Sequence, residues 1–115
     1  MKRTFIEVPN FTKKWKELGF SDEELRLLQN RIMSDPEIGK IMVGIGGVRK
    51  MRFELPGQGK SGSVRVCFID FQIYEKVYLL TVYTKKKKEN LTDEECNQLK
   101  KLVSLLKREA GKNYE

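Results

Sequence analysis

The sequence predicts an α+β fold, with a small, twisted and mainly antiparallel sheet, an N-terminal helical hairpin and a C-terminal helix. Two observations predict it. Three segments alternate in polarity with a period of two, as strands with one buried face do: VRKMRF at 48–53, SVRVCFI at 63–69 and YLLTVYTK at 78–85. The flanking regions instead repeat apolar residues at helical spacing. We therefore expect one domain, residues 1–115, with the order β-α-α-β-β-β-α.

The chain begins with a short predicted strand and a short predicted helix. The segment 3–8 (RTFIEV) forms the strand, and Pro9 closes it. Phe11, Trp15 and Leu18 then follow at i, i+4 and i+7, which is the spacing of one helix face.

A second helix follows and completes the hairpin. Ser21 with Glu24 matches a capping box at its start. An Asp-Pro pair at 35–36 ends it, because the residue before a proline avoids helical backbone angles. The apolar stripe between these signals consists of Leu25, Leu28 and Ile32.

Two glycine-rich segments flank the first polar strand, and neither is a nucleotide loop. GIGG at 44–47 lacks the Lys-Ser/Thr of a P-loop and precedes a strand, so it predicts a tight turn. The segment 56–62 contains GKSG, but the upstream glycine spacing and the following helix of a P-loop are absent. We expect it to be a hairpin loop.

The last strand is predicted to run from Phe71 through Tyr83, after a turn near Asp70 or near Glu75 and Lys76. Four lysines at 85–88 follow, and a second capping box, Thr92 with Glu95, begins the final helix. The apolar side of this helix consists of Cys96, Leu99, Leu102, Val103, Leu105 and Leu106. Residues 111–115 are expected to fray.

The positive charge of the chain is concentrated in its middle. The net charge is +7, yet residues 40–88 hold eleven Lys or Arg against three acidic residues. That segment therefore carries about +8, and the rest about −1. Such asymmetry favours a localised anionic partner, with nucleic acid first, an acidic protein second and a membrane surface third.

Several classes of protein are excluded by what the chain lacks. No apolar run approaches the roughly 18 residues of a membrane-spanning helix, and the N-terminus has no signal-peptide core. We therefore expect a cytoplasmic protein with reduced thiols at Cys67 and Cys96. Two cysteines and no histidine argue against a zinc site and against catalytic Ser-His or Cys-His pairs. We expect neither a metal nor a small-molecule cofactor.

Alternation along the three central strands predicts one apolar face and one polar face. The apolar face gathers Met51, Phe53, Val64, Val66, Phe68, Tyr78, Leu80 and Val82. The polar face gathers Lys50, Arg52, Ser63, Arg65, Cys67, Thr81, Tyr83 and Lys85. A basic, hydroxyl-bearing face is suited to phosphates, and Cys67 is expected to fill space within it.

The polar face offers groups for cleavage of an RNA phosphodiester by the ribose 2′-hydroxyl. Converging cations at Lys50, Arg52 and Arg65 would stabilise the pentavalent phosphorane. Arg65 can donate two parallel hydrogen bonds to nonbridging oxygens, which a lysine cannot. The alternative for such residues is a solvated strand surface without chemistry.

Candidates for proton transfer are fewer. Tyr83 is a candidate acid or a stacking platform for a base, and its alternative role is packing. Lys85 is a candidate base, since neighbouring cations favour its neutral form. Candidate RNA-contacting residues without a chemical role are Arg49, Lys60, Ser63, Lys86, Lys87 and Lys88. The lysine run would follow a phosphate backbone without sequence preference, or else form a solvated loop.

Nearly the whole chain resembles the RelE/ParE superfamily of bacterial toxins, and most closely its HigB branch. The resemblance is carried by DPEIGKIMVGIGGVRKMRF at 35–53, GKSGSVRVCF at 59–68 and VYLLTVYTKKKKENLT at 77–92, in that order and spacing. It implies a RelE-like fold and a ribosome-dependent endoribonuclease that cuts mRNA in the decoding site. It also implies a HigA-like antitoxin as partner.

The resemblance also implies site residues. The paired basic residues after the glycine turn correspond to Lys50 and Arg52, the arginine of the next strand to Arg65, and the lysine after the last strand to Lys85. Some relatives carry a reactive tyrosine where this chain has Asn-Leu-Thr at 90–92, and others a histidine that is absent here. Two alternatives remain open: a ParE-like gyrase inhibitor and a non-catalytic nucleic-acid-binding relative.

Overall fold

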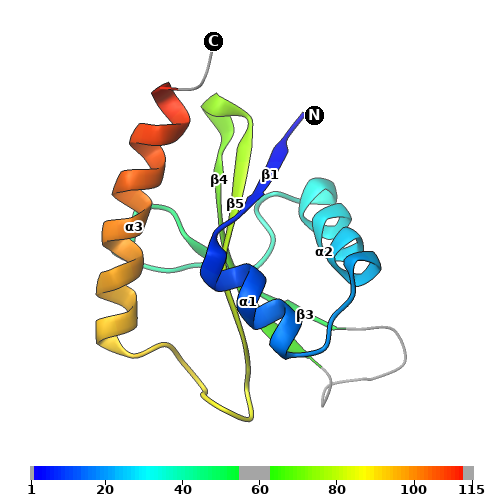
Figure 1. Cartoon of the computed structure of the whole chain (residues 1–115). Coiled ribbons are helices and arrows are strands. Elements are labelled where there is room, and N and C mark those ends of the chain that lie inside the picture. The colour runs from blue at the N-terminus through cyan, green and yellow to red at the C-terminus, as the bar shows by residue number, and fades with distance from the viewer. Residues whose placement is uncertain (1, 55–62, 113–115) are drawn as a thin grey trace.

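The computed structural model describes residues 2–54 and 63–112, which form a five-stranded sheet between helices (Figure 1). The elements are β1 (Thr4–Glu7), α1 (Pro9–Glu17), α2 (Asp22–Ser34), β2 (Lys40–Ile41), β3 (Arg49–Phe53), β4 (Val64–Phe71), β5 (Lys76–Thr84) and α3 (Asp93–Lys112). The strand order is β1-β5-β4-β3-β2, and only the β1–β5 pair is parallel. The predicted α+β class and order are confirmed, with the two-residue β2 as an addition.

Local sequence signals explain the helical hairpin. α1 begins at Pro9, because a proline at the first helical position loses no intrahelical hydrogen bond. The predicted capping box of α2 is confirmed: Ser21 Oγ accepts from Glu24 N at 3.2 Å, and Glu24 Oε1 accepts from Ser21 N at 2.8 Å. Asp35, the residue before the proline, is extended and ends α2.

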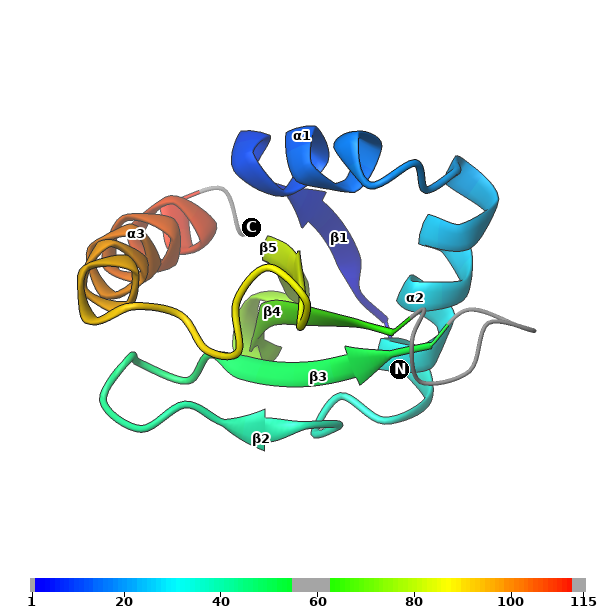
Figure 2. The same ribbon diagram turned by 90° about the horizontal axis from the view of Figure 1, so that it is seen from below.

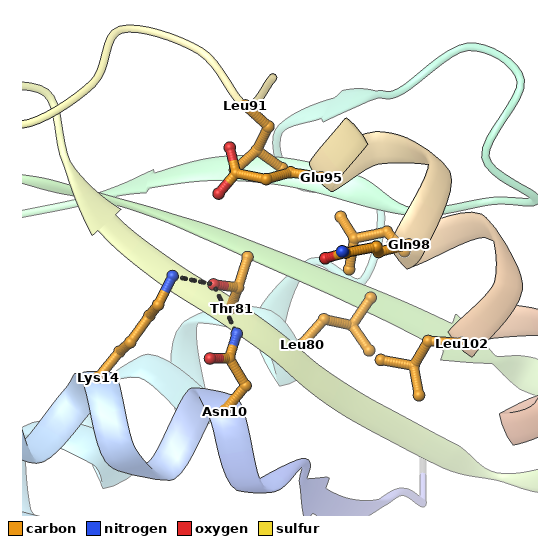
Figure 3. Close-up of a pocket in the computed structure, with 9 residues that line it drawn as sticks. Asn10, Lys14, Leu80, Thr81, Leu91, Glu95, Gln98 and Leu102 are labelled. Carbon is orange, nitrogen blue, oxygen red and sulfur yellow. Dashed lines mark hydrogen bonds between the residues drawn. The ribbon is translucent and has the colours of Figure 1, made fainter. Parts of the chain in front are cut away.

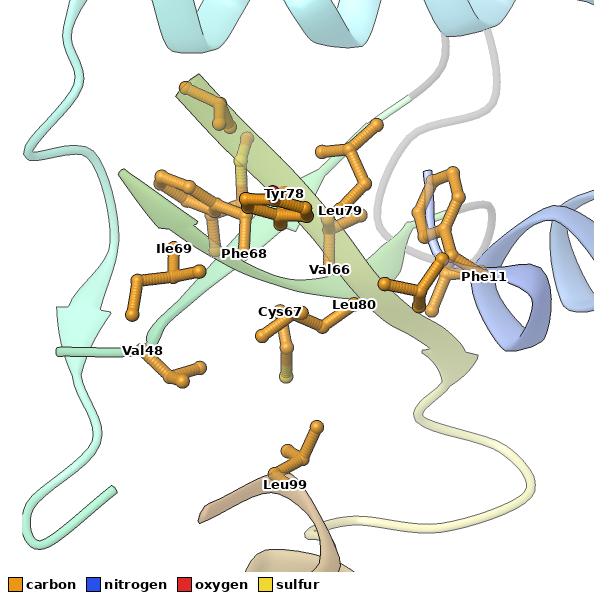
Figure 4. Close-up of a cluster of buried hydrophobic side chains, with 14 of the residues drawn as sticks. Phe11, Val48, Val66, Cys67, Phe68, Ile69, Tyr78, Leu79, Leu80 and Leu99 are labelled. Carbon is orange, nitrogen blue, oxygen red and sulfur yellow. The ribbon is translucent and has the colours of Figure 1, made fainter. Parts of the chain in front are cut away.

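Helices cover both faces of the sheet, as Figure 2 shows. On the side of α1 and α2, the rings of Trp15 and Phe53 lie 6.1 Å apart, and the Arg31 guanidinium lies 6.0 Å from the Phe53 ring. On the other side, Leu99 of α3 faces Cys67 (Figure 4). The predicted polar face is therefore partly covered by α3 and is not open along its whole length.

A β-bulge in β5 corrects the predicted apolar face. Cys67 pairs with Thr81, but Phe68 pairs with Leu79, so Leu80 is an extra residue. From that point Tyr78 lies opposite Ile69, on the α3 side of the sheet. The prediction that Tyr78 and Leu80 share the face of Val82 is wrong, because a bulge reverses the alternation of the strand that carries it.

The C-terminal part follows the predicted signals closely. A 3₁₀ turn at Gln72–Tyr74 and a left-handed Glu75 (φ 54°) join β4 to β5, which confirms the second of the two predicted turn positions. Gly111 and Lys112 belong to α3, where fraying was expected, and 113–115 lie outside the described residues. Within 2–54 and 63–112, no helix is long and apolar enough to cross a membrane.

Candidate nucleic-acid interface

The register of β3 and β4 brings together three cations that we call the basic strand cluster: Lys50, Arg52 and Arg65. Arg52 lies directly opposite Arg65, and Lys50 is opposite Cys67, two residues away on the same face. Directly opposite residues on a sheet have Cβ atoms about 5 Å apart. The predicted sharing of one face by these three residues is confirmed, and it concentrates three positive charges at one end of the sheet.

The cluster has only weak internal partners. The Arg52 side chain is 49% exposed, and its Nη1 lies 3.7 Å from Glu54 Oε1. Lys50 Nζ lies 3.3 Å from Asn90 Oδ1, and Arg65 Nη1 lies 3.5 Å from Ser63 Oγ. The exposed ion pair of Arg52 contributes about 0–1 kcal/mol to stability, and the other two contacts are long hydrogen bonds. The three cations are therefore able to exchange these contacts for contacts with a bound anion.

The lysine loop, residues 85–88, follows β5 directly. Lys85, Lys86 and Lys87 are exposed, whereas Lys88 forms an ion pair with Glu95 at 2.5 Å. The backbone N–H groups of Lys87 and Lys88 both donate to the carbonyl of Thr84 at 3.2 Å. The loop is thus attached to the strand on one side and to the first turn of α3 on the other.

Acid is expected to loosen the attachment of the lysine loop to α3. The hydrogen bond from Lys88, aided by the Thr92 backbone N–H, lowers the pKa of Glu95 below its usual value. A carboxyl with a lowered pKa stabilises the fold above its unfolded pKa, and that contribution is lost as the pH falls through its folded pKa. We expect Glu95→Gln to lower the thermal midpoint at pH 7 and to have a smaller effect at pH 3. An equal effect at both pH values would contradict this.

Tyr83 lies on the same face as the cluster, directly opposite Arg65. It is only 4% exposed, and its hydroxyl is buried without a hydrogen-bond partner among the described residues. Burial raises the pKa of Tyr83 to about 12. The phenol is therefore protonated at neutral pH, which fits a proton donor, and the buried ring offers no free surface for stacking.

Replacing Tyr83 by phenylalanine separates a chemical role from packing. A buried hydroxyl without a partner costs free energy, so Tyr83→Phe is expected to keep or raise the free energy of unfolding, by up to about 1 kcal/mol. RNA cleavage is expected to fall by at least about tenfold if the phenol donates a proton. Chemical denaturation and a cleavage assay on the same preparation measure the two effects. A loss of stability would contradict the unpartnered state of the hydroxyl.

The remaining predicted residues are spread over different surroundings. Arg49 pairs with Phe68 on the opposite face, and its Nη1 donates to the Glu37 carbonyl at 2.8 Å, so it does not join the cluster. Ser63 is buried beside Arg65. Lys60 lies outside the described residues. Among the predicted RNA-contacting residues, the lysines at 86–88 are the ones that follow the end of β5.

Cys67 lies beneath the cluster and is inert. It is fully buried, and burial raises the pKa of its thiol to about 12. Its sulfur lies 4.0 Å from that of Met42. A thiol with this pKa stays protonated, and only a thiolate is a nucleophile. The expectation that Cys67 fills space agrees with this environment.

A groove between α1, β5 and α3, lined by both polar residues and leucines, was not foreseen from the sequence (Figure 3). Its volume is about 370 Å³, and its lining includes Glu95 and Gln98 of α3. Asn10 Nδ2 and Lys14 Nζ both point at Thr81 Oγ1, at 3.4 and 3.5 Å. Alternation placed Thr81 on the polar face, but no local signal shows which helices border it.

The fold and the basic strand cluster define a small mixed α/β protein whose sheet carries one concentrated positive surface. A family model described as the RelE toxin of the RelE/RelB toxin–antitoxin system matches residues 3–113. The chain belongs to this RelE toxin family, whose members pair with an antitoxin.

Solved structures agree with this fold. A mutant of the E. coli toxin RelE in the free state is 18% identical, with a TM-score of 0.56 over 77% of this chain and 90% of that one. The intact E. coli RelBE toxin–antitoxin complex contains a chain that is 18% identical, with a TM-score of 0.52 over 71% of this chain and 95% of that one. At this identity the likeness shows the fold alone.

Proposed function

We propose that this toxin is a ribosome-dependent endoribonuclease of the HigB-like branch, which stops translation by cutting mRNA in the decoding site. The observation that carries the proposal is the register of β3 and β4, with Arg52 opposite Arg65 and Lys50 on the same face. The exposed lysines at 85–87 extend this positive surface along the path of a bound strand.

In the proposed reaction the ribose 2′-oxygen attacks the adjacent phosphorus. The 2′-O–P bond forms as the P–O5′ bond breaks, which gives a 2′,3′-cyclic phosphate and a free 5′-hydroxyl. Negative charge grows on the nonbridging oxygens of the phosphorane, and the guanidinium groups of Arg52 and Arg65 can donate to them in pairs. Lys50 adds a third charge beside them, so the cluster favours the transition state over the ground state.

Proton transfer is proposed to involve Lys85 and Tyr83. Lys85 is exposed and is the candidate base for the 2′-hydroxyl proton. The protonated Tyr83 is the candidate donor for the departing 5′-oxygen, and 4% of this residue is exposed. The chain contains no histidine, so a group of the ribosome or the substrate is proposed to complete the proton transfers.

A HigA-like antitoxin is the proposed partner that holds the toxin inactive. Opposite charge would bring an acidic antitoxin segment to the basic strand cluster, and electrostatic attraction speeds association at low salt. Such a segment would occupy the positions that the phosphate oxygens need.

Controlled expression in bacteria tests the proposal. Primer extension on a translated mRNA, and on the same mRNA without its start codon, is expected to show cuts in the translated message alone. Growth arrest without cuts would favour a gyrase inhibitor, which a DNA supercoiling assay would then detect. No arrest at all would favour a non-catalytic binding protein.

A further inference from the structure

The outer surface of α3 carries a second group of cations, which we call the α3 basic face. All five of its cations are exposed: Lys100, Lys101, Lys107, Arg108 and Lys112. Glu109 is the one acidic residue in the stretch 100–112, whereas three acidic residues occupy the first turn of the helix. The stretch 100–112 therefore has five cations against one acidic residue and a net charge of +4.

Internal pairing does not explain these cations. Among residues 2–54 and 63–112, the ion pairs join Arg3 with Asp70, Arg52 with Glu54 and Lys88 with Glu95, and none includes the α3 basic face. Complementing the helix dipole explains only Lys112, because that effect falls off within the last turn. Lys100 and Lys101 lie about two to three turns upstream, so their charge is available for a partner.

The spacing of the cations fits a repeating polyanion. Lys101, Arg108 and Lys112 lie at i, i+7 and i+11, on one stripe of the helix. With a rise of about 1.5 Å per residue, this stripe is roughly 16 Å long. A nucleic-acid duplex presents a charge about every 1.7 Å along its axis, so the stripe can meet several phosphates at once.

A shallow hollow extends the face towards the turn between β4 and β5. Tyr74 forms one wall, and Ser104, Lys107, Arg108 and Lys112 line the other side. The hollow lies at the opposite end of β5 from Tyr83. At about 3.3 Å per residue, that places it roughly 20–30 Å from the basic strand cluster. The C-terminal part of the α3 basic face, which borders this hollow, is therefore separate from the basic strand cluster.

The residues on the surface of α3 favour a phosphate backbone over a membrane or a protein as the partner of the α3 basic face. The apolar side of α3, which includes Leu99, Val103 and Leu106, is buried against the sheet, so no apolar face remains to enter a bilayer. The exposed side offers one large apolar residue, Leu105, whereas the centres of protein interfaces are rich in apolar and aromatic contacts.

We propose that the α3 basic face binds the sugar–phosphate backbone of folded RNA, apart from the strand held at the basic strand cluster. Its contacts are to phosphate oxygens, so the binding has no sequence preference and weakens steeply with salt. The choice of RNA over DNA rests on the proposed function. The surface would hold the toxin on a large RNA while the cluster acts on a second strand.

Salt titration of RNA binding tests this proposal. The test variant carries Lys100→Gln, Lys101→Gln, Lys107→Gln and Arg108→Gln, and the control carries Lys2→Gln, Lys13→Gln, Lys16→Gln and Arg26→Gln. Both sets remove four exposed charges. The probe is a fully paired RNA hairpin, and a DNA hairpin of the same sequence serves for comparison. Each lost phosphate contact reduces the magnitude of the slope of log K against log salt by about 1. Relative to wild type, this slope is expected to fall by about 3–4 in the test variant and by less than about 1 in the control.

The outcomes separate this proposal from its rivals. Equal losses in both variants would show an effect of net charge alone and would overturn it. The proposal would also be overturned if the test variant kept the wild-type salt slope for RNA but bound the antitoxin or anionic phospholipid vesicles more weakly. Stronger binding of the DNA hairpin would overturn the choice of RNA. A slope loss confined to the test variant supports the proposal even if the wild-type protein cuts no mRNA. If the fourfold variant unfolds, Lys101→Gln alone is expected to reduce the slope by about 1.

Discussion

Replacing Arg65 with alanine is expected to abolish growth arrest and to lower RNA cleavage by at least about 10²-fold, while the protein stays folded. The substitution removes the cation opposite Arg52 and with it the two donors that we propose for the phosphorane. It disturbs little else, because the contact with Ser63 at 3.5 Å is the hydrogen bond described for this guanidinium. Expression of the variant, with circular dichroism of the purified protein, measures both effects.

Two further variants show whether the effect at Arg65 comes from its paired donors and its position. Arg65→Lys keeps the charge but loses the paired donors. Its cleavage activity is therefore expected to lie between those of the wild type and Arg65→Ala. Arg26→Ala removes an exposed arginine of α2, away from the cluster, and is expected to retain full activity. A toxin with Arg65→Ala that still arrests growth would exclude the assigned role.

Removing the ion pair between Arg3 and Asp70 is expected to be strongly destabilising. Arg3 Nε lies 2.7 Å from Asp70 Oδ1, and Nη2 lies 3.1 Å from Oδ2, so the pair is bidentate. The two side chains are only 6% and 14% exposed. Asp70→Ala leaves a partly buried guanidinium with the Lys2 carbonyl as its remaining acceptor, which is expected to lower the free energy of unfolding by about 2 kcal/mol. Urea denaturation measures the change.

A matched acidic residue provides the control for Asp70. Glu54 pairs with Arg52 at 3.7 Å, but both side chains are more than 40% exposed, so Glu54→Ala is expected to cost less than about 1 kcal/mol. Replacing Arg3 and Asp70 together by alanine is expected to recover part of the loss, since no unpaired charge then remains. Equal costs for Asp70→Ala and Glu54→Ala would contradict the difference in burial as the cause.

Much of the fold was predictable because its signals are local. The capping boxes at Ser21 and Thr92 depend on residues three positions apart, and both formed as predicted. Alternation within β3 and β4 placed Lys50, Arg52 and Arg65 on one face without any knowledge of the register. The site was predictable to the extent that it lies on two regular antiparallel strands, β3 and β4.

The parts that were not predictable depend on long-range contacts. The bulge at Leu80 arises in the pairing of β4 with β5, so the sequence of β5 alone does not show it. The burial of Tyr83 depends on chain segments that cover the sheet from outside the strand. Arg49 is an exception, because the local period of two alone directs it to the face opposite Lys50.

The most direct test of ribosome-dependent cleavage uses purified components. A defined mRNA is incubated with the toxin, with and without ribosomes whose decoding site is open, and the 5′ ends of the fragments are mapped. We expect cuts within the codon at the decoding site when ribosomes are present, and intact mRNA without them. Intact mRNA in both reactions, or the same cuts in both, would contradict the proposed function.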